Sequence, residues 1–264
     1  MINRLFSIVC WLTFVAVFVV AGCSQRYEEE VLAIEPDVEK ITVTNSYTPR
    51  AIGAVGGYQA WMKTKELRFD CVVTFYKPDG SFYLTQQRHE VYPWSNSIRI
   101  SAFEPQGRFT WQLSAEQFSV LEGADKVDAL PISVCGRDFA EAILDIITAP
   151  VRFLDTEVGF DEEPKPVKME GLWYYPIERA SRDAEPYWSK VVFYQNTDSA
   201  LVDMIWFADG GEGRFLAVRG YDYSKVEKKD VLVPAKIEIF KTDAGGFLQR
   251  RLAKIDYYLL KSVE

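Results

Sequence analysis

The sequence has a single histidine, His89, among its 264 residues. A metal site built from several histidines is therefore excluded, and only one imidazole is present for a catalytic triad. His89 lies in a polar stretch, residues 86–90, that we expect to face water as part of a strand. Neither a Gly-x-Ser-x-Gly motif nor a phosphate-binding glycine loop occurs, and the glycines of residues 209–213 are typical of a hairpin turn. We predict a protein that is not an enzyme, has no catalytic residues and needs no cofactor or metal.

Basic residues are also scarce: 30 Lys and Arg stand against 38 Asp and Glu, for a net charge of −8. This balance argues against nucleic acid as a partner and against binding to anionic lipid through charge. Five acidic residues form a cluster that lacks the spacing of any known calcium-binding loop. We expect them to be a run of charges exposed to solvent: Asp155, Glu157, Asp161, Glu162 and Glu163. Paired carboxylates for carbohydrate chemistry cannot be identified from sequence, because such partners come from distant strands.

The N-terminus has the pattern of a secretory signal peptide. Arg4 precedes an apolar run from Leu5 to Val20, and Ala21 and Gly22 lead to Cys23. The tetrapeptide resembles the lipobox of bacterial lipoproteins. This resemblance implies cleavage between Gly22 and Cys23, and lipidation of Cys23 with acyl chains such as palmitate, which together hold a protein stably on a membrane. The other interpretation is an uncleaved transmembrane helix over residues 5–22, at the short end of the spanning range.

The predicted lipid anchor places the protein in the cell envelope. Ser24 follows the cysteine, and the resemblance to lipoproteins then implies the outer membrane, with the protein facing the periplasm. Because Cys10 leaves with the signal peptide, Cys71 and Cys135 remain for the exported domain. They form either a possible disulfide or two buried free thiols, since cysteine also packs well as a small hydrophobe.

Three segments follow from these boundaries: a signal peptide at 1–22, a lipidated N-terminus and charged tether at 23–47, and a single domain at 48–264. The domain begins with a predicted helix over residues 48–62, and a second helix lies between Gly136 and Pro150, with apolar residues at helical spacing. Period-two alternation between polar turns predicts about eleven strands. These strands are residues 67–75, 82–92, 98–102, 109–113, 117–122, 171–178, 190–195, 201–208, 214–221, 235–241 and 248–260.

Several predicted strands are apolar on both faces, most clearly residues 191–194 and 201–207. An antiparallel sheet with one face in water should alternate cleanly, so the second face must also be covered. This pattern favours a curved, unclosed antiparallel barrel with a helical lid over an apolar cavity. A sandwich with a fully packed core is the alternative.

The chain resembles the family of LolA, LolB and RseB, the outer-membrane lipoprotein-sorting proteins and a related sensor. The resemblance rests on the lipobox, the helix around Ala51 to Trp61 with its Gly-Gly pair, the strand meander, and the C-terminal strand–turn–strand segment of residues 232–257. It implies an eleven-stranded half β-barrel that accepts acyl chains. The extra length around residues 155–190 is a departure from the simple carriers.

We therefore predict a lipoprotein that binds acyl chains or lipidated proteins, as a carrier, receptor or sensor. The alternatives are a structural or protein-interaction lipoprotein with a solid core, and a carbohydrate-binding or carbohydrate-active protein. The candidate residues for the cavity are large or apolar side chains of the predicted helix and strands, which are otherwise ordinary core: Trp61, Phe69, Val73, Ile100, Trp111, Phe193, Met204 and Trp206.

Overall fold

The computed structural model describes residues 47–104, 108–114, 117–122, 134–154, 159–160, 164–180 and 186–263. The predicted signal peptide, the lipidation site at Cys23, the cleavage site after Gly22 and nearly all of the tether lie outside the described residues. The same is true of the five acidic residues between positions 155 and 163. The predictions for these segments and for the domain boundaries stay predictions. No helix in the described part of the chain is long and apolar enough to cross a membrane.

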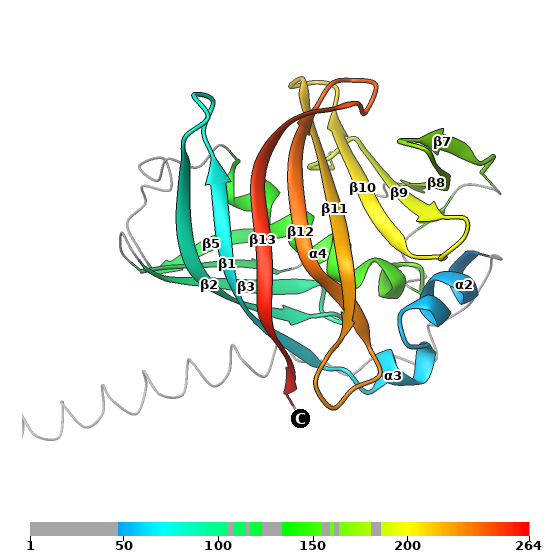
Figure 1. Ribbon diagram of the computed structural model, residues 1–264, viewed down its shortest axis with the longest axis horizontal. Coiled ribbons are helices and arrows are strands. Elements are labelled where there is room, and N and C mark those ends of the chain that lie inside the picture. Colours follow the sequence, from blue (N-terminus) through cyan, green and yellow to red (C-terminus); the bar gives the residue numbers. More distant parts are fainter. Residues whose placement is uncertain are drawn as a thin grey trace, which may run out of the picture.

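The described strands form one sheet with antiparallel pairing throughout, built from two consecutive meanders (Figure 1). The first meander comprises β1 (Glu66–Tyr76), β2 (Phe82–Tyr92), β3 (Ser97–Glu104), β4 (Phe109–Ser114) and β5 (Gln117–Glu122). The second comprises β8 (Leu172–Ala180), β9 (Lys190–Asn196), β10 (Val202–Asp209), β11 (Arg214–Lys225), β12 (Leu232–Thr242) and β13 (Leu248–Val263). All eleven predicted strands are confirmed.

The two meanders become one sheet because β1 pairs with β13, from Glu66 opposite Val263 to Phe75 opposite Ala253. The strand order is β5-β4-β3-β2-β1-β13-β12-β11-β10-β9-β8-β6. Its two ends, β5 and β6, do not pair with one another among the described residues. The sheet is therefore curved and unclosed, which confirms the predicted half-barrel.

Two short strands were not predicted, and both pair with β8: β6 (Gly159–Phe160) and β7 (Val167–Met169). Strands of two and three residues are too short for an alternating pattern to be recognised. The turn between β7 and β8 consists of Glu170 and Gly171, both with positive φ, at 49° and 90°. Two positive φ values in succession are typical of the tight type I′ hairpin turn.

The predicted helix over residues 48–62 is wrong in one respect, because it is two helices. They are α2 (Tyr47–Ala54) and α3 (Tyr58–Met62), separated at Gly56 and Gly57 with φ of 107° and 85°. A side chain at Gly56 would clash with the loop between β11 and β12, since an ideal Cβ there lies 2.0 Å from the carbonyl oxygen of Asp230. The close approach also brings Val55 O within 3.0 Å of Leu232 N as a hydrogen bond.

The second predicted helix is confirmed as α4 (Gly136–Arg152), which connects the two meanders in sequence. It lies on one side of the sheet, behind the strands in Figure 1, and packs against β3 and β4 of the first meander and β10, β11 and β12 of the second. A continuous buried core between this helix and the sheet draws on both meanders and on α2 and α3.

The break between α2 and α3 makes a stability prediction. Replacing Gly56 with Ala forces a positive φ on a residue with a Cβ and pushes that Cβ into Asp230 O, so we expect a loss of at least about 2 kcal/mol in the free energy of unfolding. Gly53 is the matched control, because nothing lies within 4 Å of its ideal Cβ inside α2. Gly53→Ala should be neutral or stabilising by up to about 1 kcal/mol. Urea unfolding measures both, and equal effects would contradict the role given to Gly56.

Candidate functional site

The concave side of the sheet, covered by α4, is the candidate functional site. Phe139, in the first turn of α4, packs on the sheet with its ring 5.2 Å from that of Phe75 on β1 and 6.3 Å from that of Trp111 on β4. Nearer the other end of the helix, Phe153 contacts Phe193 of β9 at 5.5 Å between ring centroids. Aromatic pairs at these separations add packing energy beyond the apolar area that they bury. The helix thus occupies the space expected for an acyl chain.

The structure brings six of the eight predicted cavity residues together and sends two elsewhere. Six are completely buried members of the core under the helices: Trp61, Phe69, Val73, Ile100, Trp111 and Phe193. Met204 and Trp206 are on β10 but belong to the opposite, outer face, outside this core. Trp206 donates from Nε1 to Thr242 Oγ1 at 3.0 Å and stacks on Phe215. The sheet register therefore places Met204 and Trp206 outside the predicted cavity.

Polar contacts hold the first turn of α4. The carboxylate of Asp138 accepts a hydrogen bond from the hydroxyl of Tyr187 and lies 3.5 Å from Arg214 Nη1. Arg214 in turn donates to Tyr187 Oη at 2.7 Å. Burial raises the pKa of Asp138, while the hydrogen bond from Tyr187 and the positive charge of Arg214 act against that rise. The N-terminal end of the lid helix is thus fixed by a desolvated ionic cluster.

A second polar cluster lies further along the same helix. Asp145 is 1% exposed and sits between Arg152 at 3.4 Å and Arg179 of β8 at 3.5 Å. Arg152 also donates to Asn96 Oδ1, in the turn before β3. One turn before Asp145, burial and the negative charge of Asp145 raise the pKa of Glu141 to about 7. Charged contacts therefore hold the first turn, the middle and the last turn of α4, alongside its apolar packing.

The inner face of β2 carries a line of buried polar side chains that sequence reasoning assigned wrongly. His89 was expected to face water, but it is completely buried. Its Nδ1 lies 2.8 Å from Tyr257 Oη, and its Nε2 lies 2.9 Å from Gln87 Oε1. Gln87 Nε2 donates to Thr85 Oγ1 at 2.8 Å. The apolar residues at both alternate sets of positions in β2 concealed which set points inward.

The two cysteines of the domain do not form the possible disulfide. Cys71 is buried and free, with Sγ 3.6 Å from His89 Nε2, and Cys135 is exposed and free at the N-cap of α4. Burial raises the pKa of the Cys71 thiol well above its usual value. Only Cys135 therefore has the exposure that a reactive thiol needs.

A metal site has no support in the described part of the chain. No group of three or more His, Cys, Asp or Glu residues there is placed to hold a metal ion. The acidic cluster between positions 155 and 163 lies outside that part. The arrangement consists of an apolar wall, a line of buried polar side chains on β2 and a helix held by both charged and apolar contacts.

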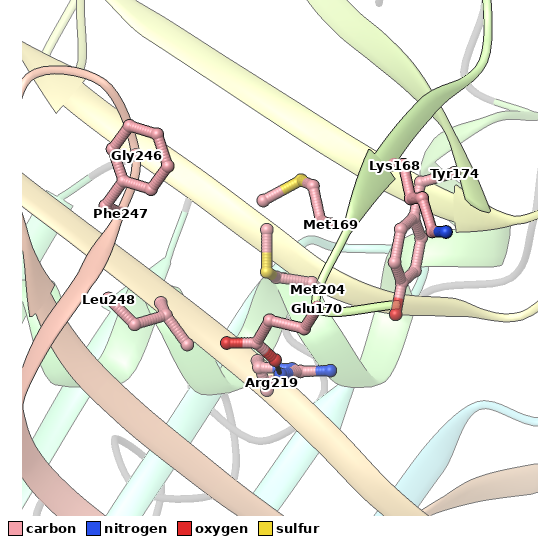
Figure 2. Close-up of a pocket in the computed structure, with 9 residues that line it drawn as sticks. All are labelled: Lys168, Met169, Glu170, Tyr174, Met204, Arg219, Gly246, Phe247 and Leu248. Carbon is pink, nitrogen blue, oxygen red and sulfur yellow. Dashed lines mark hydrogen bonds and ion pairs between the residues drawn. The ribbon is translucent and has the colours of Figure 1, made fainter. Parts of the chain in front are cut away.

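A pocket lies on the outer face of the sheet, away from α4 (Figure 2). It has a volume of about 160 Å³, and its floor includes Met204 of β10 and Arg219 of β11. Met169 and Tyr174 of the β7–β8 hairpin lie on one side, and Phe247 of the β12–β13 turn lies on the other. This pocket explains why β10 is apolar on both faces, because a hairpin and a turn cover its outer side.

The sequence matches no known protein family and no curated protein. Solved structures to which the chain is similar include three from different bacteria. A LolA superfamily protein from Nitrosomonas europaea gives a TM-score of 0.52 at 14% identity, over 84% of this chain and 94% of that one. A DUF1329 family protein from Desulfovibrio piger gives 0.46 at 12% identity, over 82% and 91%. A domain from Vibrio parahaemolyticus, named as an outer membrane lipoprotein-sorting protein domain, gives 0.44 at 9% identity, over 82% and 88%.

The likeness to the Nitrosomonas protein confirms the predicted LolA-like fold. At this identity it shows the fold alone, so the ligand has to be argued from the residues of this chain.

Burial of His89 makes a prediction about pH. Burial lowers the pKa of His89 from 6.5 to about 3, so the unfolded chain binds a proton that the folded chain does not. The stability from this site is complete above pH 6.5 and is lost as the pH falls towards 3, at about 1.4 kcal/mol per pH unit. His89→Gln keeps a hydrogen-bonding side chain without this titration. Between pH 7 and pH 5, we expect the wild type to lose about 2 kcal/mol more than the variant.

Urea unfolding at the two pH values measures this difference. No other histidine contributes, because the chain has only one. Glu141, whose raised pKa gives stability at low pH that is lost as the pH rises through 7, is present in both proteins and cancels. Equal losses in the two proteins would mean that His89 is protonated within the fold.

Proposed function

We propose that this protein is a non-enzymatic lipoprotein of the bacterial cell envelope that holds an acyl chain or the lipid of a lipidated partner between α4 and the concave face of the sheet. The single observation that carries the proposal is that one helix, α4, packs on the apolar face of strands from both meanders and is held there by a few ion pairs as well. Such a helix is a lid that moves as a unit. Cys23 supplies the anchor, on the outer membrane and facing the periplasm, in accordance with the lipobox.

An acyl chain enters only if α4 moves, because the wall residues Phe69, Val73 and Ile100 are completely buried. Moving the helix exposes this wall, and an acyl chain that takes the place of the helix buries the wall again. A palmitoyl chain contributes about 12 kcal/mol when all of its methylenes are buried, which offsets part of the packing that the helix loses.

The exposed thiol of Cys135 gives a direct test of lid movement. A bimane label on Cys135 lies next to Trp111, since an ideal Cβ at the neighbouring Gly136 would lie 3.5 Å from the Trp111 ring. Tryptophan quenches bimane fluorescence at contact, so the fluorescence of the label should be low while the lid is closed. With residues 24–264 free of detergent, addition of palmitate should give saturable brightening, and native mass spectrometry should show the bound mass.

Two controls make the test specific. Cys71 is buried and should stay unlabelled. In Trp111→Phe the quencher is absent and the aromatic packing is kept, so the label should be bright with or without palmitate. An unchanged signal together with an apo mass after lipid is offered would refute the proposal and favour an interaction protein with a solid core, which the complete burial of the inner wall would then explain.

A further inference from the structure

The outer-face pocket is independent of the lid and has a chemistry of its own. Met169, Met204, Phe247 and Leu248 supply apolar and thioether surface around about 160 Å³. A cavity of about 150 Å³ with apolar walls accommodates a benzene ring, so this pocket has room for one side chain of the size of Leu, Met or Phe. Methionine side chains adapt to differently shaped partners because they are unbranched and polarizable.

Exposed apolar side chains stand on the two protruding elements that flank this pocket. Phe247, at the tip of the β12–β13 turn, is 74% exposed, and Trp173 of the β7–β8 hairpin is 49% exposed. Val167 and Leu172, on the same hairpin, are also exposed. A small molecule inside the pocket would leave this rim in water. An exposed apolar rim around a small hole is instead typical of a surface that a second polypeptide covers.

The charges of the pocket specify what accompanies the apolar side chain. Lys168 and Arg219 line it, against the single carboxylate of Glu170. Glu170 pairs with Arg219 and so holds the hairpin over the pocket, as Figure 2 shows. Lys168 makes no ion pair within the described residues and lies 6.0 Å from the centre of the Trp173 ring. Lys168 is therefore a positive charge at the rim without a carboxylate partner among the described residues, and a carboxylate on a docked segment complements it.

We propose that this pocket, between the β7–β8 hairpin and the β12–β13 turn, is a docking site for a polypeptide segment in which an aliphatic or aromatic side chain stands next to an acidic residue. The apolar side chain enters between Met169, Met204 and Phe247. The carboxylate meets Lys168 at the rim. This surface is on the opposite side of the sheet from α4, so a docked partner and a ligand under the lid can be present together.

The methionines of the chain allow a direct test. Of the four, Met169 and Met204 line the pocket, and Met62 lies in α3, away from it. The full-length protein, labelled with ¹³C at the methionine methyl groups and held in lipid nanodiscs, is titrated with three capped peptides. The first carries Leu-Phe flanked by Asp, the second has Lys in place of Asp, and the third has Ala-Ala in place of Leu-Phe. Met169→Leu and Met204→Leu assign the two signals.

We expect the acidic apolar peptide to shift the Met169 and Met204 signals saturably and to leave Met62 unchanged. Its affinity should exceed that of each of the other two peptides by about tenfold or more, because each lacks one half of the recognised chemistry. Lys168→Gln should weaken the acidic peptide and leave the lysine peptide unaffected, which separates charge recognition from a change in the fold.

Three results would overturn the proposal: no saturable shift at millimolar peptide, equal affinity for the acidic and lysine peptides, or equal shifts at Met62. Phenylacetate is tested as a further ligand, and its binding decides between a polypeptide and a small molecule. If it binds as tightly as the peptide, the pocket is a site for small apolar acids and not a polypeptide surface.

Discussion

The pairing of β1 with β13 is the constraint on which the rest of the structure depends. These strands lie at opposite ends of the described chain, and their ladder runs from Glu66 opposite Val263 to Phe75 opposite Ala253. It turns two meanders into one curved sheet. Because α4 packs on strands of both meanders, its binding face exists only once they are joined. The half-barrel, the core and the lid therefore form together, through contacts between residues that are far apart in sequence.

The strands were predictable because alternation is a local property, and the eleven long strands all appear. What sequence reasoning missed depends on contacts between distant segments. The helix through Gly56 has acceptable local periodicity, but Asp230, from a loop more than 170 residues away, leaves no room for a Cβ there. Of the two glycines, only Gly56 is closely packed, and together they end one helix and begin another.

The candidate site shows the same division between local and distant information. Apolar strands on both faces indicated that each face is covered, and this is confirmed for β10. What covers each face was not encoded locally: α4 lies over Ile205 and Phe207, whereas the β7–β8 hairpin and the β12–β13 turn lie over Met204. In β2, the sequence did not indicate which of the two alternating sets of residues faces the interior. Phe82 and Leu84 suggest one set of positions for the interior, yet these two are exposed and the set with His89 is buried.

The distribution of charge on α4 has a consequence for how this lid opens. Asp138 in the first turn and Asp145 in the middle of α4 are ion-paired, and the ring contacts of Phe139 and Phe153 are apolar. When α4 leaves the sheet, water solvates the released charges and recovers much of what their pairing contributed. Nothing in water does the same for the apolar wall. Opening is therefore disfavoured mainly by apolar surface, and a ligand shifts this equilibrium only by its differential affinity for the open state. The acyl chain of the proposed function would have that differential affinity, since it would cover the wall that α4 leaves without competing for the charges.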